Sequence, residues 1–223
     1  RDGENAGELA KDEINHANMV RLMVGRELSE FYDRDIHQPG DCVLKAMNVV
    51  SPTYPEIPVS IEVRAGEIVG IAGLVGAGRT ELLQTFFGVA PSLGGELEVQ
   101  GVSFSPRSPS DAVHAGLALA PEDRKHHGLV LPMTVRENSS LPSLERDQKM
   151  GFLDHSKEKE IADEAVEQMK IKTPSIEQAA RFLSGGNQQK IVLGKWLAMN
   201  PKLLMLDEPT RGIDIGAKRE IYK

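Results

Sequence analysis

Cysteine, aromatic side chains and long apolar runs are all scarce in this 223-residue chain, and positive charge is not in excess. Cys42 is the one cysteine, so no internal disulfide can form, which suits a reducing compartment. The longest apolar stretch, residues 68–78, contains four glycines and is far shorter than the roughly 20 residues that span a bilayer. The 26 lysines and arginines face 33 acidic residues, a net charge of −7 without a basic block, which argues against nucleic acid as a partner.

The residues that are present can build a core in one large domain, or in one domain and a piece of another. Hydrophobic residues make up 40% of the chain, which excludes a disordered protein. Residues 1–41 differ from the rest because they are acidic, poor in apolar side chains and end in a turn-forming cluster at 38–41. We interpret them as a linker or the tail of a preceding unit, with one short helix expected over residues 14–26.

From Cys42 onward, short apolar runs alternate with segments of helical periodicity. Residues 67–73 form a β-branched apolar run typical of a buried strand. Residues 156–170 place apolar side chains on one helical face, with Ser156 as the expected N-cap. This alternation predicts an α/β fold with a partly parallel sheet. Strands are expected at 43–50, 57–63, 67–73, 96–99, 102–104, 117–120 and 202–207, and helices at 79–87, 110–115, 156–170 and 185–199.

Residues 73–80, Gly-Leu-Val-Gly-Ala-Gly-Arg-Thr, follow an expected strand and open an expected helix. They match the phosphate-loop pattern G-x-x-x-x-G-K-[ST], except that Arg79 stands where lysine is usual. Backbone amides in such a loop cradle phosphate oxygens, and the hydroxyl of Thr80 can hold Mg²⁺. Arg79 keeps the charge but replaces a compact ammonium with a planar fork. A glycine-rich turn without a ligand remains open, whereas a Rossmann fingerprint would need a third glycine.

Two acids, Asp207 and Glu208, stand where the apolar run at 203–206 ends. In phosphoryl-transfer sites the first acid of such a pair binds the Mg²⁺ shell, and the second can orient or activate a water. We therefore assign Asp207 to metal and Glu208 to the base. The alternative from these residues alone is an acidic pair that begins a polar loop.

The most specific segment is 183–190, Leu-Ser-Gly-Gly-Asn-Gln-Gln-Lys, which opens the helix expected at 185–199. A serine and two glycines at a helix start expose a hydroxyl and free amides, which suit an anion. The alternative is that Ser184 is a plain N-cap.

Together these three segments resemble an ATP-binding cassette of the ABC transporter superfamily. The strings at 183–190 and 206–218 are most similar to the second cassette of bacterial monosaccharide importers of the ribose, galactose and xylose type, whose ATPase subunit carries two cassettes in one chain. The string Glu-Asp-Arg-Lys at 122–125 and the arginine in the phosphate loop also match that second half. Residues 1–3 resemble the closing hairpin of a first cassette, and residues 23–26 the linker between the two.

The resemblance implies a P-loop NTPase of the ABC type, with a mixed sheet and a helical subdomain that carries the signature motif. It divides the chain into residues 1–41, the tail of a preceding cassette with a linker, and residues 42–223, a cassette that is incomplete at its C-terminal end. A cassette of this family would continue with a further strand and a switch residue.

The resemblance also assigns roles to individual residues. Residues 73–80 become the Walker A loop, and Asp207 and Glu208 become Walker B, with Glu208 catalytic. Tyr54 is expected either to stack on adenine or to be only a turn residue. The remaining assignments are nucleotide binding by Gly73, Gly76, Ala77, Gly78, Arg79 and Thr80; Mg²⁺ binding by Thr80, Asp207 and Glu122, the last in place of a glutamine; signature contacts to a nucleotide held by another cassette by Ser184, Gly185, Gly186, Asn187 and Gln188; and a D-loop acid at Asp214.

The function implied is that of an ATP-binding and ATP-hydrolysing subunit of a simple-sugar importer, with ATP and Mg²⁺ as cofactors. Arg79 marks this half as the degenerate cassette, which supplies its signature motif to the partner cassette's site. The implied partners are a second cassette in the same chain or in a dimer, sugar-permease membrane subunits and, indirectly, a periplasmic sugar-binding protein. The implied location is the cytoplasmic face of the inner or plasma membrane. The alternative is a soluble ABC-type ATPase of DNA repair or translation.

Overall fold

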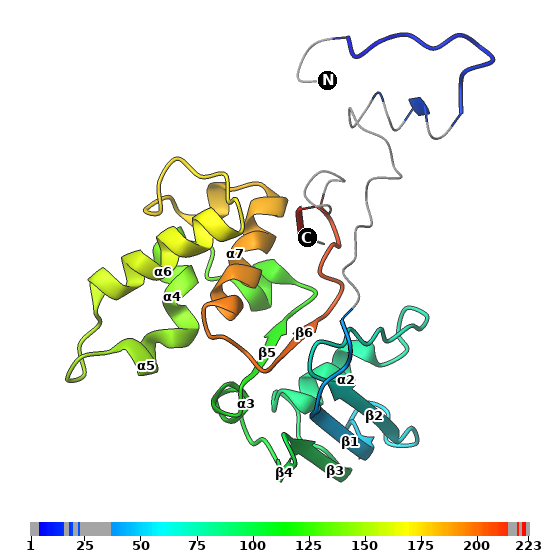
Figure 1. Cartoon of the computed structure of the whole chain (residues 1–223), viewed down its shortest axis with the longest axis vertical. Helices are drawn as coiled ribbons and strands as arrows, with labels where there is room; N and C mark the ends of the chain where they lie inside the picture. The colour runs from blue at the N-terminus through cyan, green and yellow to red at the C-terminus, as the bar shows by residue number, and fades with distance from the viewer. Residues whose placement is uncertain are drawn as a thin grey trace.

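In the part of the chain that the structure describes, the strands form two separate β-sheets (Figure 1). The structure is a computed structural model that describes residues 5–15, 18–19, 22, 37–213, 218 and 220–221. The first sheet is antiparallel, in the order β2-β1-β3-β4, and the second is a parallel pair, β5-β6. The strands are β1 (Cys42–Val50), β2 (Val59–Arg64), β3 (Gly94–Val99), β4 (Val102–Ser103), β5 (Leu117–Ala120) and β6 (Leu203–Leu206).

The antiparallel sheet follows the apolar patterns that the sequence predicts. Leu44 and Ala46 on β1 are buried, with an intervening half-buried lysine, which is the period-two alternation of a strand with one face on a core. Gln100 and Gly101 both have positive φ values, 51° and 76°, in the two-residue turn between β3 and β4. Two such residues in succession suit a tight hairpin, so the hairpin expected at 96–104 is confirmed.

The parallel pair sets the position of the acidic strand end. Its register runs from Leu117 opposite Leu203 to Ala120 opposite Leu206, and all four residues of β5 are buried. The amide of Asp207 donates to the carbonyl of Ala120 at 2.9 Å, which extends the pairing by one residue. Because carboxyl ends of parallel strands share one edge, the loop after β5 lies beside the segment after β6.

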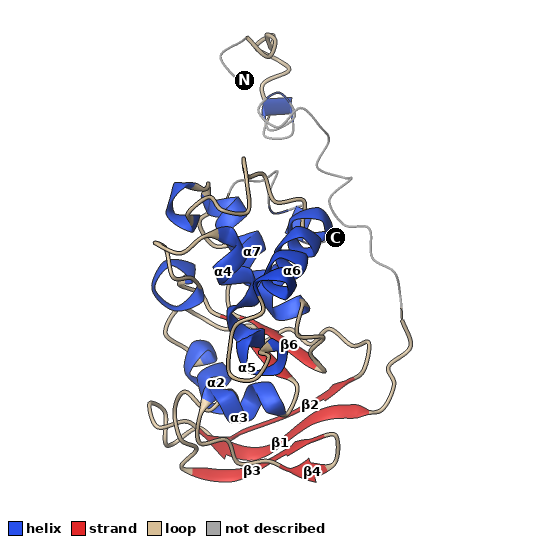
Figure 2. Cartoon of the chain, turned by 90° about the vertical axis from the view of Figure 1, so that its left-hand side faces the viewer, coloured by secondary structure: helices blue, strands red, loops and turns tan. Residues whose placement is uncertain are grey.

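Helices occupy the end of the molecule opposite the antiparallel sheet (Figure 2). There α4, α6 and α7 pack on one another, while α2 and α3 lie over the sheet. The ring of Phe87, after α2, meets the ring of Trp196 on α7 edge to face, with centroids 5.7 Å apart, so one core joins the two regions. The helices are α2 (Arg79–Phe86), α3 (Pro109–His114), α4 (Val135–Ser140), α5 (Leu144–Asp147), α6 (His155–Gln168) and α7 (Gly185–Leu197), with shorter turns η2 (Arg124–Gly128), η3 (Leu141–Ser143) and η4 (Ala180–Phe182).

The cap of α6 is a correction to the sequence analysis. The N-cap is Asp154, whose carboxylate accepts from the amides of Ser156 and Lys157, so α6 begins one residue before Ser156. Aspartate is as good an N-cap as serine, and an acid at this end also suits the helix dipole.

The strand expected at 67–73 is wrong. This segment has no regular secondary structure, and Ile68 is 78% exposed. Among the described strands none pairs with it, and β6 is paired only with β5. A strand needs a neighbour for its backbone hydrogen bonds, and apolar sequence alone does not supply one.

Several expectations fall on residues outside the described part. These are Asp214, residues 1–4 and 23–26, and most of the helix expected over 14–26, of which residues 18, 19 and 22 are helical. In the part of the chain that the structure describes, no helix has both the length and the apolar character to cross a membrane.

Candidate functional site

The glycine-rich loop turns into α2 through two glycines in the left-handed region. Gly76 has φ 82°, and Gly78, the N-cap of α2, has φ 84° and ψ 12°. Only glycine adopts these angles without a steric penalty. A Cβ at Gly76 would touch nothing within 4 Å, whereas one at Gly78 would lie 2.7 Å from Cδ2 of Tyr54. Gly76 is therefore required by conformation, and Gly78 by conformation and close packing.

Tyr54 helps to shape this loop. Its hydroxyl donates to the carbonyl of Gly76 at 2.6 Å, and its ring lies against Gly78. Tyr54 lines a cavity of about 120 Å³ together with Ala77, Arg79 and Leu82. Tyr54 is thus next to the phosphate loop, as the sequence analysis expects of an adenine-stacking residue, and the stacking itself stays a prediction.

An ion pair joins the phosphate loop to the acidic pair that follows β6. Nη1 of Arg79 lies 3.1 Å from Oε1 of Glu208, and the two side chains are 29% and 44% exposed. Glu208 has φ 44°, a left-handed conformation that costs a non-glycine residue about 1–2 kcal/mol. The start of α2 and the end of β6 therefore meet, and the unusual arginine is bound to the expected base.

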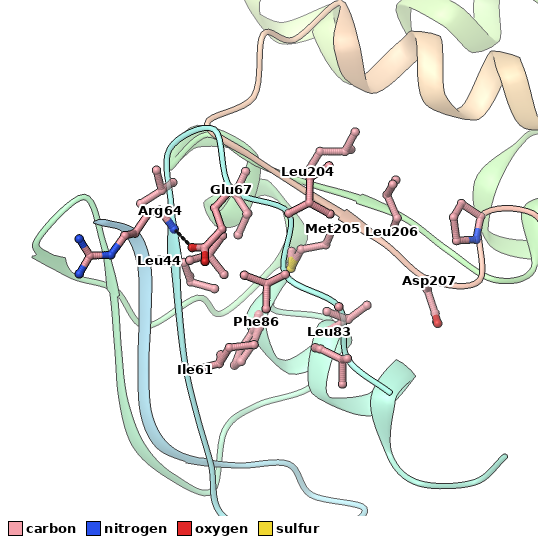
Figure 3. A pocket seen from close by; sticks show the side chains of 18 of the residues that line it. Leu44, Ile61, Arg64, Glu67, Leu83, Phe86, Leu204, Met205, Leu206 and Asp207 are labelled. Atoms are coloured by element: carbon pink, nitrogen blue, oxygen red, sulfur yellow. Dashed lines mark hydrogen bonds between the residues drawn. The ribbon is translucent and has the colours of Figure 1, made fainter. Parts of the chain in front are cut away.

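Both residues of this ion pair line a cavity of about 660 Å³, and Figure 3 shows other side chains that line it. It lies between the segment 64–71 and β6, and Arg79, Asp207 and Glu208 are among its lining residues. The close-up shows Leu83 of α2 and Asp207 on the same side of the pocket, and Phe86 and Met205 also line it. The site thus has apolar walls, and charged groups gather where α2 begins and β6 ends.

The magnesium role expected of Thr80 and Asp207 stays a prediction. Thr80 follows Arg79 in the first turn of α2, and Asp207 precedes Glu208, so each of these oxygen donors is the sequence neighbour of one member of the ion pair. Magnesium commonly takes one or two protein oxygens and completes its shell with phosphates and water. Among the described residues no group of three or more histidine, cysteine or acidic side chains could hold a metal without such help.

The segment expected as the signature starts α7 and exposes its serine. Ser184 is the N-cap, and its Oγ accepts from the amide of Asn187 at 3.4 Å and from Nδ2 of Asn187 at 3.0 Å. Oδ1 of Asn187 accepts from the amide of Lys172, and Nε2 of the buried Gln188 donates to the carbonyl of Ala180. Asn187 and Gln188 hold the helix start in place, which leaves the hydroxyl of Ser184 at the surface.

The signature segment does not face the chain's own phosphate loop through the main cavity. None of the described residues 183–190 lines the cavity that contains Arg79 and Glu208. The signature segment and the phosphate loop therefore do not share this cavity.

Glu122 meets a cation. Its carboxylate forms an ion pair with the guanidinium of Arg211, four residues after Asp207. The metal role expected for Glu122 would require it to leave that partner, and it stays a prediction. The guanidinium of Arg124, two residues on, donates to the carbonyls of Arg211 and Gly212.

Arg124, Arg211 and Lys195 are residues that sequence reasoning did not select. Arg124 stood out only as part of the string at 122–125, and its contacts are with residues more than 80 positions away. Lys195 is buried on α7, where its Nζ donates to the carbonyl of Gly128, and burial lowers its pKa to about 8. A lysine within an otherwise apolar helix face was the only sequence signal for it.

Comparison with known proteins decides the family. Residues 57–211 match the family model described as ABC transporter. The chain belongs to the ABC transporter family. The resemblance in the sequence is thereby confirmed, and membership implies a nucleotide-binding cassette.

Curated relatives are similar along the whole chain. The ribose import ATP-binding protein RbsA of Yersinia pestis is 43% identical over 224 residues, which cover 100% of this chain and 44% of that protein. The protein of the same name from Bacillus subtilis is 45% identical over 223 residues, again 100% of this chain and 45% of the relative. The chain thus spans less than half the length of the curated relatives that it matches.

Solved structures confirm the ABC cassette fold. The ATP-binding cassette MJ0796, as a dimer in a post-hydrolysis state with ADP and Pi, aligns with a TM-score of 0.66 and 20% identity, over 80% of this chain and 79% of that chain. MJ1267, an ATP-binding cassette of an ABC transporter, aligns with a TM-score of 0.63 and 25% identity, over 81% and 74% of the two chains. The fold class expected from the sequence, a P-loop NTPase with a mixed sheet and a helical subdomain, is confirmed.

Proposed function

We propose that this ABC chain is the second, degenerate cassette of the ATP-binding subunit of a bacterial simple-sugar importer. The observation that carries the proposal is the ion pair between Arg79 and Glu208. It couples the residue that should grip phosphate to the residue that should activate water, so each reduces the charge available to the other. The names of the relatives, which are ribose import ATP-binding proteins, support the sugar class.

ATP would bind with its phosphates at the amides of the loop at 73–80, where the two left-handed glycines shape the backbone. Thr80 and Asp207 would hold Mg²⁺, whose charge offsets that of the phosphates during transfer. Glu208 would orient the attacking water only after Arg79 releases it. We therefore expect ATP to bind here weakly and to turn over slowly compared with ordinary cassettes.

The signature segment is intact, and it serves a second cassette. Ser184 is exposed at the start of α7, and the signature residues do not line the cavity beside this chain's own phosphate loop. A hydroxyl and free amides at a helix start suit the terminal phosphate of a nucleotide held by another cassette. Hydrolysis in the intact transporter would thus use the partner's phosphate loop and this chain's Ser184.

The partners, the location and the division into domains that we propose follow from the role as a second cassette. The partners are a second cassette, in the same chain or in a dimer, and sugar-permease membrane subunits that receive a periplasmic sugar-binding protein, at the cytoplasmic face of the membrane. Residues 42–223 would be the cassette, and residues 1–41 the tail of a preceding cassette and its linker. A cavity lies between residues 64–71 and β6. A further strand placed there would pair with the free side of β6 and bury Ile68, which supports the proposal that the cassette has one more strand than this chain.

The decisive experiment compares two substitutions in the full-length subunit, assembled with its permease in vesicles. Ser184→Arg should abolish ATP-driven sugar uptake, because a bulky cation blocks closure over the partner's nucleotide, while Ser184→Ala should retain part of it. Glu208→Gln should leave most of the uptake. Uptake that survives Ser184→Arg but is lost in Glu208→Gln would overturn the assignment of the degenerate half. Binding of DNA or ribosomes at physiological salt would favour the alternative, a soluble ABC-type ATPase.

A further inference from the structure

We propose that Arg124 is a positioning residue that fixes the start of the signature helix to the segment after β6, an inference that rests on the proposed function. The fork of this arginine lies where three separate pieces of the chain meet: the loop after β5, residues 211–212 and the first residue of α7. No motif assigned from the sequence includes this contact.

The first half of the contact joins the two strand ends. Because β5 and β6 run parallel in register, the loops that follow them leave the same edge (Figure 1). Nη1 of Arg124 donates to the carbonyl of Arg211 at 3.0 Å, and Nη2 donates to that of Gly212 at 3.4 Å. Glu122, on the same loop, holds the side chain of Arg211 in an ion pair. The loop after β5 thus grips residues 211–212 by both backbone and side chain.

The second half of the contact reaches the signature. A Cβ built on Gly185 would lie 2.6 Å from Nη2 of Arg124 and 3.4 Å from the carbonyl oxygen of Gly212. Such proximity shows that the guanidinium and the Gly212 carbonyl pack directly against the backbone that follows Ser184. A side chain at position 185 would therefore force the guanidinium of Arg124 to shift.

The two hydrogen bonds at position 124 require the guanidinium group of arginine. Two carbonyls are bound at once by the planar fork, a geometry that the single ammonium of lysine does not reproduce. The Nε of Arg124 is buried without a hydrogen-bond partner among the described residues, so the side chain is held by its two terminal nitrogens. Any displacement of residues 211–212, which follow Asp207 and Glu208 closely, would move the guanidinium and with it Gly185 and Ser184.

The consequence concerns the partner cassette's reaction. If Ser184 acts on a nucleotide held by another cassette, Arg124 sets where that hydroxyl stands without touching the nucleotide itself. A displacement of about 1 Å in a positioned group can reduce turnover by roughly 100-fold. Loss of Arg124 should therefore lower turnover, while ATP binding and folding remain close to normal.

The test uses the full-length, two-cassette protein. Arg124→Lys and Gly185→Ala should each reduce kcat for ATP roughly 10- to 100-fold, with KM changed by less than about threefold. Arg211→Ala is the matched control, because it removes the ion pair with Glu122 but keeps the carbonyl that Arg124 binds; it should change kcat far less. In an Arg124→Ala background, adding Gly185→Ala should cost nothing further, because the space for the methyl group is then free.

A second measurement does not depend on catalysis. Amide hydrogen exchange of the same full-length variants should rise at 184–187 and at 211–213 together in Arg124→Lys, whereas in Arg211→Ala exchange at 184–187 should stay at the wild-type level. Equal and independent effects of Arg124→Ala and Gly185→Ala, or unchanged exchange at 184–187 in Arg124→Lys, would overturn the proposal. If Ser184→Arg were also fully active, the failure would lie instead in the proposed function.

Discussion

Replacing Glu208 with glutamine should strengthen ATP binding at the phosphate loop, because it releases Arg79 from its ion pair. Nη1 of Arg79 lies 3.1 Å from Oε1 of Glu208, so phosphate oxygens must compete with a carboxylate for the same guanidinium. The side chains are 29% and 44% exposed, and water therefore screens the pair, which is worth at most about 1 kcal/mol. That energy corresponds to roughly a two- to fivefold gain in affinity for Glu208→Gln.

Isothermal titration of ATP with Mg²⁺ into the chain measures this gain. It should shrink at high ionic strength, because salt screens an exposed ion pair. Glu62→Gln is the control, since it removes an exposed carboxylate whose partner, Arg64, lies outside the phosphate loop. Arg79→Lys should also bind more tightly than the wild type, because a compact ammonium reaches between phosphates where a planar fork does not.

Removal of any negative charge near a phosphate site could raise ATP affinity, so a double-mutant cycle separates the two explanations. In an Arg79→Ala background there is no guanidinium to release, and Glu208→Gln should then give little or no gain. An affinity for Glu208→Gln that equals or falls below the wild-type value would refute the competition argument. A gain of the same size in both backgrounds would refute it as well.

Three further predictions concern stability and are measured by urea unfolding of the chain. Gly78→Ala should lower the free energy of unfolding by about 2–4 kcal/mol, because the position has a left-handed φ and the new Cβ would lie 2.7 Å from Tyr54. Gly76→Ala has the same kind of φ but nothing within 4 Å of the new Cβ, so it should lower the free energy by only about 1–2 kcal/mol, and equal losses would contradict the packing role of Tyr54. Asp154→Ala should cost about 1 kcal/mol by removing the cap of α6, and a loss of that size in Ser156→Ala instead would show that the cap is wrongly assigned. Burial lowers the pKa of Lys195 from its usual 10.5 to about 8, so the unfolded state binds more protons between those values. The unfolding free energy of the wild type relative to Lys195→Met should therefore rise by up to about 3 kcal/mol from pH 8 to pH 10.5, and a flat difference would show that Lys195 is not buried as described.

Local sequence patterns predict those features that depend only on neighbouring residues. The turn between β3 and β4, the glycines of the phosphate loop and the start of α7 at Ser184 each depend on the conformational preferences of a few adjacent residues. The family strings at 73–80, 183–190 and 203–210 likewise indicated the ABC cassette that the comparisons confirm. The error at Ser156 was small, since Asp154 two residues earlier offers the same kind of cap.

Contacts between distant segments could not be read in this way. Residues 67–73 have a strand's composition, yet a strand forms only beside a partner, and in this structure the side toward β6 is a cavity. The ion pair of Glu122 with Arg211 depends on the parallel pairing of β5 with β6, and that of Arg79 with Glu208 depends on the placement of the start of α2 beside the end of β6. Burial of Lys195 depends on what covers α7.

The sequence by itself thus determined which chemical groups this ABC chain carries and how each short segment bends, because those properties follow from neighbouring residues. Only the tertiary structure decided which of those groups meet. It is the parallel pairing of β5 with β6 that brings Arg124 to the carbonyls of Arg211 and Gly212 and against Gly185, and no spacing along the chain encodes that encounter.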